Sequence, residues 1–368
     1  MRFVITGGGT AGHVNPALAV AQELRVCGHE VHYAGTPSGL ESRLIPQEGF
    51  PYVGFDAAGF NRNKPLTLVP STAKIAAGTL KASRWLKALR PDVVVGFGGY
   101  VSIPVGLAAS RLKIPLAIHE QNSKSGMANR FLAKRAQLVA LTYACAAHDF
   151  VTSAEVVTIG NPVRASLFEA QRSDARALFG LPQGATVLLA FGGSLGALHI
   201  NEALVANAEE LMSLKGLHIL HITGTRDFEQ ISSKIAGIPQ AKGRWHIIGY
   251  CDRMGEAYAA SDAVLSRAGA TTLAEISALR KPALLVPYPY AAADEQTTNA
   301  ASLVSVRAAA MLADGELDGP LFMAKLKPFI VDRDYREKMQ AAAGLLGSAQ
   351  ARQEFARLVV ELAGADKD

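Results

Sequence analysis

Two glycine-rich loops, half a chain apart, contain the residue types that bind phosphate groups or sugars. The first loop, GGTAG at residues 8–12, follows the apolar run FVI at 3–5. The second loop, GGSLG at 192–196, follows VLLAF at 187–191. Such a loop joins the carboxyl end of a parallel strand to a helix, where backbone N–H groups can hold an anion. For one loop alone, a strand-to-helix turn without a ligand is an equally good interpretation.

Neither loop has the lysine of a P-loop, which disfavours ATP. Gly7, Gly9 and Gly12 match the GxGxxG spacing of dinucleotide sites, but this pattern alone is a weak signal and the second loop lacks it, so we also disfavour NAD. His13 directly follows the first loop and is a candidate general base, because imidazole exchanges protons near neutral pH. A histidine that only caps backbone groups is the alternative.

Polar residues follow two further apolar runs. GGYVS at 98–102 follows the run at 93–95, and HEQN at 119–122 follows the run at 116–118. Because the carboxyl ends of parallel strands meet at one edge of a sheet, we expect these residues to form one crevice with the first loop. Four polar residues in a row are hard to explain as packing, so we interpret HEQN as functional.

The second half places polar residues at two predicted helix starts. RAGATTLAE at 267–275 follows the apolar run at 263–265. The helix N-terminus favours a diphosphate and the Glu275 carboxylate suits the two hydroxyls of a ribose, although Thr272 and Glu275 also match a capping box. DEQTTN at 294–299 offers donors and acceptors for a sugar, or else it starts another helix.

The sequence requires neither a metal nor another cofactor. Asp332 and Asp334 have the DxD spacing of metal-dependent sugar transferases, but a helix cap explains them better. No histidine or cysteine cluster has the spacing of a zinc site. Glycine loops and helix N-termini can neutralise a leaving diphosphate without a divalent ion.

Composition narrows the classes of partner. The net charge is +5, but the basic residues are dispersed and no DNA or RNA motif is present, which disfavours nucleic acid and leaves an anionic membrane surface or an acidic substrate. No apolar run reaches the roughly 18 residues needed to span a bilayer. We expect Cys27, Cys145 and Cys251 to be reduced thiols in the core of a cytoplasmic protein.

The elements that must position these residues alternate along the chain, which predicts an α/β fold of parallel βαβ units. A length of 368 residues fits two such domains. Predicted strands are 3–5, 30–33, 93–95, 116–119, 187–191, 218–222, 246–248, 263–265 and 283–286, and predicted helices are 16–26, 80–89 and 334–363. We place an N-terminal domain at 1–164, a hinge in the polar stretch 169–176, a C-terminal domain at 165–344, and a terminal helix at about 345–368 that packs back on the first domain.

Seven motifs in this order resemble those of the MurG family of bacterial glycosyltransferases. The motifs are GGGTAGH at 7–13, GFGGYVS at 96–102, HEQN at 119–122, GNPVR at 160–164, GGSLGA at 192–197, SRAGATTLAE at 266–275 and DEQTTNA at 294–300. The resemblance implies the GT-B fold, with two Rossmann-like, doubly wound parallel-sheet domains facing across a cleft. It also implies inverting transfer of N-acetylglucosamine from UDP-GlcNAc to the 4-hydroxyl of MurNAc in undecaprenyl-diphosphoryl-MurNAc-pentapeptide (lipid I), giving lipid II and UDP.

The same resemblance implies a role for individual residues. His13 matches the proposed base, and Gly98, Gly99 and Tyr100 are candidates for the loop at the acceptor diphosphate. Donor-binding residues implied by the motifs are Thr10, Ala11, Gly12, Asn122 and Arg164 at the sugar and diphosphate, Ser194 at the diphosphate, Cys251 at uracil, Ala270, Thr271, Thr272, Leu273, Ala274 and Glu275 at the α-phosphate and ribose, and Gln296 at the GlcNAc hydroxyls.

Three positions depart from the family pattern, in which glycine, glutamine and serine are common where this chain has Ala11, Leu195 and Ala274. Ala11 keeps the turn if its φ is negative, whereas Leu195 removes an amide. We expect the donor to be unchanged and its affinity to differ.

The resemblance also implies peripheral attachment to the cytoplasmic face of the inner membrane. Apolar and basic residues alternate between 65 and 90, which suits an anionic headgroup layer, although an ordinary helix with one buried stripe is the alternative. Proteins of cell-wall synthesis are further candidate partners. Rival functions are another GT-B transferase with a different acceptor, a non-catalytic nucleotide-sugar-binding protein, and a nucleotide-sugar epimerase of related fold.

Overall fold

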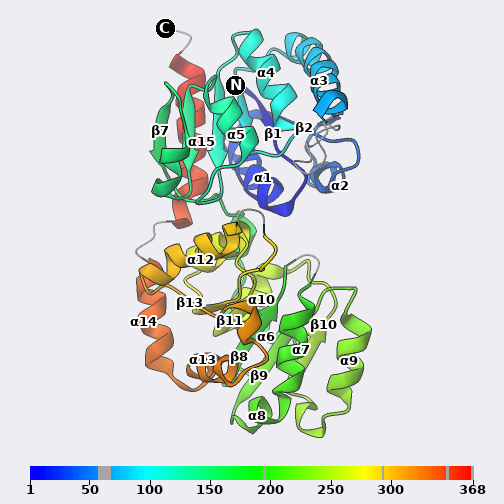
Figure 1. Cartoon of the computed structure of the whole chain (residues 1–368), viewed down its shortest axis with the longest axis vertical. Coiled ribbons are helices and arrows are strands. Elements are labelled where there is room, and N and C mark those ends of the chain that lie inside the picture. The colour runs from blue at the N-terminus through cyan, green and yellow to red at the C-terminus, as the bar shows by residue number, and fades with distance from the viewer. Residues whose placement is uncertain (57–67, 194–195, 292–293, 345–347, 366–368) are drawn as a thin grey trace. The chain divides into compact units, whose positions relative to one another are not determined.

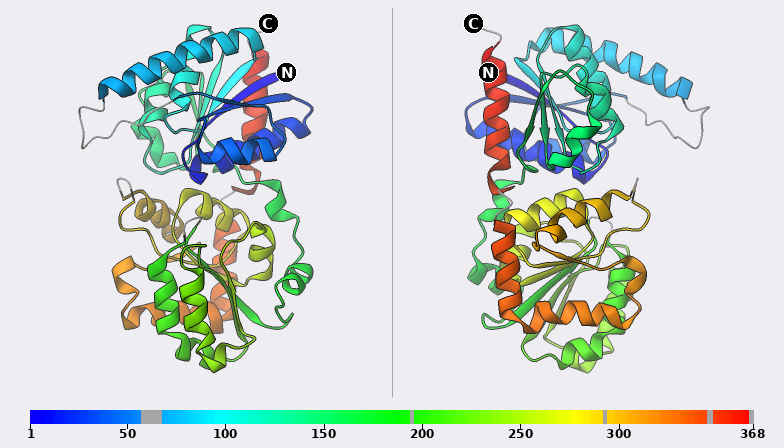
Figure 2. Two further views of the ribbon diagram at one scale, coloured as in Figure 1. Left: turned by 90° about the vertical axis from the view of Figure 1, so that its right-hand side faces the viewer. Right: turned by 60° about the vertical axis from the view of Figure 1, so that its left-hand side comes forward.

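The chain folds into two compact units, which a computed structural model describes at residues 1–56, 68–193, 196–291, 294–344 and 348–365 (Figure 1). One unit comprises Met1–Arg164 together with Ser348–Asp368, and the other comprises Ala165–Gly347. In each unit, helices cover both faces of a parallel sheet (Figure 2).

The sheet of the first unit has seven strands in the order β3-β2-β1-β4-β5-β6-β7, and every neighbouring pair is parallel. The strands are β1 Arg2–Thr6, β2 Glu30–Gly35, β3 Tyr52–Gly54, β4 Val93–Gly96, β5 Leu116–Glu120, β6 Leu138–Leu141 and β7 Glu155–Thr158. The helices are α1 Ala11–Val26, α2 Leu40–Gln47, α3 Leu68–Leu89, α4 Ser102–Arg111, α5 Met127–Ala133 and α15 Ala351–Ala365, with shorter 3-10 segments η2 Ala144–Asp149 and η7 Ser348–Gln350.

Alternate residues of β1 supply the two halves of this unit's core. Phe3 and Ile5 pack on the side that includes Phe355 of α15, and Val4 packs on the side that includes Leu86 of α3. All three β1 residues are fully buried. Because helices cover both faces, an uninterrupted apolar run is the expected sequence of such a strand.

The terminal helix α15 packs against the first unit. Arg352 forms an ion pair with Glu23 of α1, with 2.6 Å between Nε and Oε2, and both side chains are largely buried. The ring of Phe355 meets that of Phe97 edge-on, with 5.7 Å between the centroids. Helix α15 is therefore part of the hydrophobic core of the first unit.

The sheet of the second unit has six parallel strands in the order β10-β9-β8-β11-β12-β13. The strands are β8 Thr186–Phe191, β9 Leu217–Ile222, β10 Trp245–Ile248, β11 Ala263–Ser266, β12 Ala283–Leu285 and β13 Ala310–Met311. The helices are α6 Arg172–Leu178, α7 Leu198–Ala206, α8 Ala208–Ser213, α9 Phe228–Ala236, α10 Met254–Ala260, α11 Ala270–Ala278, α12 Glu295–Ser305, α13 Pro320–Val331 and α14 Arg333–Gly344, with 3-10 segments η3 Ala165–Phe168, η4 Pro239–Ala241 and η6 Asp314–Glu316.

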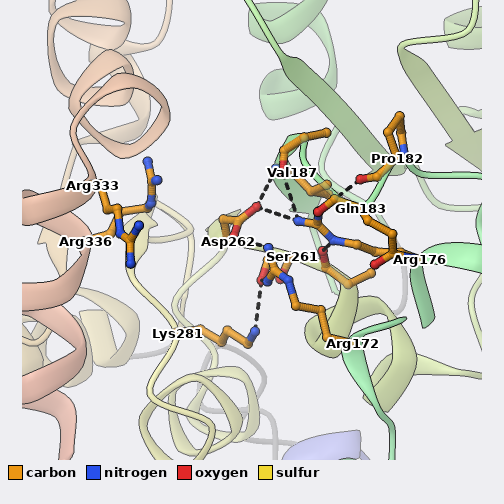
Figure 3. Close-up of polar contacts among 12 residues, drawn as sticks. Arg172, Arg176, Pro182, Gln183, Val187, Ser261, Asp262, Lys281, Arg333 and Arg336 are labelled. Carbon is orange, nitrogen blue, oxygen red and sulfur yellow. Dashed lines mark hydrogen bonds and ion pairs between the residues drawn. The ribbon is translucent and has the colours of Figure 1, made fainter. Parts of the chain in front are cut away.

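The predicted hinge at 169–176 is wrong, because most of this stretch belongs to α6, which is anchored by the fully buried Arg176. The guanidinium donates to the carbonyls of Ala260 at 3.1 Å and Ala185 at 3.0 Å and to the Asp262 carboxylate at 2.8 Å (Figure 3). Moving α6 would separate the buried Arg176 guanidinium from these partners, which is costly for a buried charge. The segment is therefore held in place and does not act as a hinge.

The predicted burial of the cysteines is also wrong. Cys27 and Cys145 are exposed and Cys251 is partly buried, and all three are free thiols. Cys27 follows the last turn of α1 and Cys145 lies in the surface segment η2, so neither faces a sheet. Within the described residues, no helix has the length and apolar character that crossing a membrane requires.

Candidate functional site

The first glycine loop joins β1 to α1 and is held by a residue that sequence analysis missed. Glu41 of α2 is fully buried and accepts hydrogen bonds from the backbone N–H of Gly9 at 3.1 Å and of Thr36 at 2.9 Å. Burial opposes the charge, but these bonds and one from the Thr36 hydroxyl outweigh it and lower the pKa of Glu41. A buried carboxylate therefore fixes the loop, and no motif around residue 41 signals it.

His13 lies in the first turn of α1 with its imidazole oriented by the same loop. Its Nδ1 is 3.0 Å from the carbonyl oxygen of Gly8 and 3.1 Å from the hydroxyl of Thr10. Because a carbonyl only accepts hydrogen bonds, Nδ1 carries the proton and Nε2 carries a free electron pair. Burial lowers the pKa of His13 more than the Gly8 carbonyl and the Glu41 charge raise it, which favours the neutral form of the ring.

The second predicted loop of this unit packs directly against His13. Gly98 has a φ of +91° and Gly99 a φ of +78°, a conformation that favours glycine. A Cβ at position 98 would lie 3.1 Å from Nε2 of His13, and one at position 99 would lie 2.4 Å from the Gly8 carbonyl oxygen. The structure thus brings together His13, Gly98 and Gly99, and the adjacent Tyr100 is 37% exposed.

In the HEQN segment at 119–122, the first three residues are enclosed within the first unit. His119, Glu120 and Gln121 are buried, and burial lowers the pKa of His119 to about 4. Burial also raises the pKa of Glu120 against several hydrogen bonds, among them those from the Asn122 N–H at 3.0 Å and the Asn129 amide at 2.9 Å. The sequence does not show that Asn129, on α5, is a hydrogen-bond partner of this segment, so local sequence alone could not predict its burial.

Asn122 and Arg164 remain candidates at this end of the first sheet. Asn122 is held at the end of β5 by Glu120. Arg164 is partly buried, and its Nε is buried without a hydrogen-bond partner among the described residues. A buried guanidinium N–H without a hydrogen bond is costly in the free protein. This cost favours a role for Arg164 in donating a hydrogen bond to an oxygen atom of a ligand.

The second glycine loop joins β8 to α7. Gly193 and Gly196 have φ values of +96° and +77°, and a Cβ at position 196 would lie 2.3 Å from the Thr223 carbonyl oxygen. The predicted diphosphate contact Ser194 and its neighbour Leu195 lie outside the described residues.

The segment after β11 enters α11, whose N-cap residue is Gly269. The capping-box interpretation is therefore wrong, because Thr272 lies inside the helix. The partly buried Ala270, Thr271 and Thr272 form its first turn, and Leu273, Ala274 and Glu275 are buried behind them. Glu275 accepts a hydrogen bond from the Tyr258 hydroxyl at 2.9 Å, so a carboxylate oxygen is fixed close to the helix start.

Gln296, in the first turn of α12, connects two neighbouring loops. Its Oε1 accepts from the backbone N–H of Ala268 at 3.1 Å and of Tyr288 at 2.9 Å. Asp294 is the N-cap residue of α12, with a φ of +56°, so the helix-start interpretation of DEQTTN holds. Cys251 follows β10, and burial raises the pKa of its thiol.

The DxD pair caps a helix, as predicted. The Asp332 carboxylate accepts from the backbone N–H of Tyr335 at 2.9 Å, at the start of α14. Over the part of the chain that the structure describes, no three histidine, cysteine, aspartate or glutamate side chains form a group that could hold a metal ion.

Comparison with known proteins assigns the family. Residues 3–141 match the model of the glycosyltransferase family 28 N-terminal domain, and residues 187–359 match that of the C-terminal domain. The chain belongs to glycosyltransferase family 28. Within it, the MurG family is shown by a relative from Halothermothrix orenii, 40% identical over 99% of both chains, and one from Moorella thermoacetica, 39% identical over 98% of this chain and 99% of the other. Both are named UDP-N-acetylglucosamine–N-acetylmuramyl-(pentapeptide) pyrophosphoryl-undecaprenol N-acetylglucosamine transferase.

Solved structures agree with this assignment. MurG of Acinetobacter baumannii is 32% identical, has a TM-score of 0.76 and covers 98% of this chain and 99% of its own. The calicheamicin glycosyltransferase CalG4 is 15% identical with a TM-score of 0.69, and the UDP-GlcNAc 2-epimerase of Neisseria meningitidis is 16% identical with a TM-score of 0.70, so these two show the fold alone. The protein is a glycosyltransferase of the GT-B fold and a member of the MurG family.

Two departures from the usual MurG pattern have a structural explanation. Ala11 is the first residue of α1, so its backbone is helical, its φ is negative and the turn is retained without glycine. Ala274 is 7% exposed, so its methyl group packs in the core of the second unit. Any ligand contact at position 274 would therefore come from the backbone.

Proposed function

We propose that the protein transfers N-acetylglucosamine from UDP-GlcNAc to the 4-hydroxyl of MurNAc in undecaprenyl-diphosphoryl-MurNAc-pentapeptide, giving lipid II. The names of its full-length relatives support this substrate pair. The observation that carries the proposal is the geometry of His13, whose Nδ1 faces the Gly8 carbonyl and whose Nε2 lies beside the glycine loop at 98–99. A partly buried base with a fixed tautomer at a glycine-lined sheet edge is the group that deprotonation of a hydroxyl needs.

In this mechanism the acceptor hydroxyl attacks C1 of GlcNAc while its proton moves to Nε2 of His13. The bond between C1 and the diphosphate oxygen breaks in the same step, the anomeric configuration inverts, and UDP leaves. Gly98 and Gly99, which have no Cβ, let this loop pack closely against the imidazole and the Gly8 carbonyl, and we assign the acceptor's diphosphate to this loop. Tyr100 follows them with its ring partly exposed.

Donor binding rests on the glycine loop and helix starts of the second unit, with three contributions from the first. The N-termini of α7 and α11 and the backbone N–H groups of their loops stabilise the charge that develops on the diphosphate. Glu275 takes the ribose, Gln296 the GlcNAc hydroxyls and the backbone at Cys251 the uracil. Thr10 with Ala11 and Gly12, Asn122, and Arg164 complete the set around the sugar and diphosphate. These donors can neutralise the leaving group, so we propose turnover without a divalent ion.

Membrane attachment is assigned to an apolar groove of about 800 Å³ on the first unit. Its lining includes the exposed Met127 and Phe131 together with Arg111 and Arg135, and Tyr100 connects it to the glycine loop. Exposed apolar side chains beside arginines suit the boundary of an anionic bilayer. We propose that this groove, with α3 beside it, contacts the cytoplasmic face of the inner membrane, where the lipid-linked acceptor resides.

One assay tests the proposed reaction against its rivals. Purified protein receives UDP-GlcNAc with a chelator, with or without a lipid I analogue, and UDP release is followed together with the mass of the lipid product. We expect release only with acceptor and a lipid product heavier by one GlcNAc. Release without acceptor would contradict the proposal in favour of hydrolysis or epimerisation, and donor binding without any release would favour a binding protein.

A further inference from the structure

A chain of four charged side chains lies at the carboxyl edge of the second sheet. Asp314, in η6, contacts Arg267 through Oδ1 and the Nδ1 of His199 through Oδ2, the latter at 2.7 Å. The other ring nitrogen of His199 is 3.2 Å from the carboxylate of Asp318. Charges therefore alternate along Arg267, Asp314, His199 and Asp318, and the first three side chains are largely buried, with exposed fractions of 10%, 15% and 29%.

This geometry sets the protonation state of His199. A carboxylate only accepts hydrogen bonds, so a ring held between two carboxylates has N–H groups on both nitrogens and is an imidazolium. Burial opposes this charge, but the hydrogen bonds to Asp314 and Asp318 outweigh it and raise the pKa of His199. The charged groups that face the ring are those two aspartates, with Arg267 behind Asp314.

The chain of charges connects two segments that begin helices. His199 is the second residue of α7 and lies three residues after Gly196, the last residue of the second glycine loop. Arg267 lies two residues before Gly269, the N-cap of α11, and also donates to the carbonyls of Val286 at 3.3 Å and Pro287 at 3.2 Å. The next residue, Tyr288, donates its N–H to Gln296. One ionic network thus spans the starts of α7 and α11 and the loop that Gln296 organises.

We propose that protonated His199 is a positioning residue for the nucleotide-sugar diphosphate. This inference rests on the proposed function, since it assigns the starts of α7 and α11 to one diphosphate. His199 does not touch the donor in this account. It holds the α7 start against Arg267 through Asp314, so that the two helix N-termini keep the spacing that a diphosphate needs. Loss of the imidazolium proton frees one carboxylate contact, loosens that spacing and weakens donor binding.

Isothermal titration with UDP-GlcNAc from about pH 6 to about pH 8 tests the proposal, because rising pH removes the imidazolium proton that the proposal couples to donor binding. The diphosphate ester of UDP-GlcNAc keeps a constant charge over this pH range, so a change in Kd reports a change in the protein. We expect Kd of the wild type to rise about fivefold or more across the range. His199→Gln should bind weakly and equally at every pH, with an unchanged melting temperature.

Asp318→Asn is the matched control, because its side chain is 80% exposed and it removes only the outer carboxylate. It should keep tight binding at low pH and lose it at a lower pH than the wild type does. Equal pH dependence in the wild type and His199→Gln would overturn the inference while leaving the proposed function intact. Failure of the wild type to bind UDP-GlcNAc at any pH would instead overturn the proposed function.

Discussion

At the scale of single residues, the basic nitrogen of His13 depends on two backbone features. The Gly8 carbonyl occupies Nδ1 and so leaves Nε2 unprotonated. Gly98 leaves space beside Nε2 that any side chain would fill. The identity of the base could be proposed from its position after a glycine loop, but its tautomer depends on the path of the loop in space.

The pH dependence of kcat/KM should reflect the lowered pKa of His13. The base acts when neutral, and its pKa lies below the ordinary 6.5. With UDP-GlcNAc saturating at every pH, so that its Kd does not enter the rate, the acidic limb should be centred below pH 6.5, where the imidazole gains a proton. Initial rates at low lipid I analogue concentration measure this profile, and an acidic limb centred above pH 6.5 would contradict the assigned environment.

Gly98→Ala should lower turnover by about tenfold or more, because its methyl group would displace the imidazole from a well-oriented position. Gly9→Ala is the matched control: position 9 has a similar φ of +86°, but a Cβ there has no heavy atom within 4 Å. Both variants bear the backbone strain of a positive φ, and only Gly98→Ala meets His13. Equal turnover in the two variants would show that contact with His13 is not what position 98 protects.

At the scale of elements, much of the fold could be predicted from apolar runs. The nine predicted strands all exist, because buried parallel strands are continuously apolar and lie between clear breaks. Four strands, β3, β6, β7 and β13, were not predicted. β7 has a largely exposed EVVT sequence and β3 and β13 are only three and two residues long, whereas β6 is a buried apolar run, LVAL, that the sequence analysis did not single out. The sequence predicts a hinge at 169–176 because that stretch is polar and charged. The partner that buries Arg176, Asp262, is 86 residues away in the chain and cannot be seen from the local sequence. The anchoring role of Glu41 was missed for the same reason.

Arg176→Ala should destabilise the second unit by about 3 kcal/mol or more, because it leaves Asp262 and several carbonyls without their donor. Arg172→Ala is the control: Arg172 also pairs with Asp262, but its side chain is 47% exposed, and exposed pairs contribute about 0–1 kcal/mol. Urea unfolding followed by Trp245 fluorescence in a Trp85→Phe background reports on the second unit alone. A similar loss in both variants would contradict the anchoring role of Arg176.

At the scale of the whole molecule, the last helix, α15, packs against the first helix, α1. Arg352 and Glu23 are 329 residues apart in sequence and form a largely buried ion pair. Helical periodicity predicts α15, whereas its docking depends on shape and charge on α1. The apolar groove of the first unit is likewise a whole-molecule feature, since its lining spans residues 75 to 135 and only part of it falls in the stretch 65–90 that sequence analysis marked.

Phe131→Ser should weaken binding to vesicles of phosphatidylglycerol and phosphatidylcholine by about tenfold, the cost of losing one inserted aromatic side chain. Phe168→Ser is the matched control, because both rings are 41% exposed and Phe168 belongs to the second unit and does not line the groove. Vesicle co-sedimentation measures the affinity, and vesicles of phosphatidylcholine alone should bind the wild type less well. Equal losses of vesicle affinity in the two variants would show that the groove is not the membrane contact.

The central claim is that His13 removes the proton from the acceptor hydroxyl, and one pair of readouts on one variant tests it most directly. For His13→Ala, single-turnover transfer from UDP-GlcNAc to a lipid I analogue is measured beside the Kd for UDP-GlcNAc. The account predicts that transfer slows by at least about 100-fold while Kd stays within about twofold of the wild type. Transfer at close to the wild-type rate would contradict it.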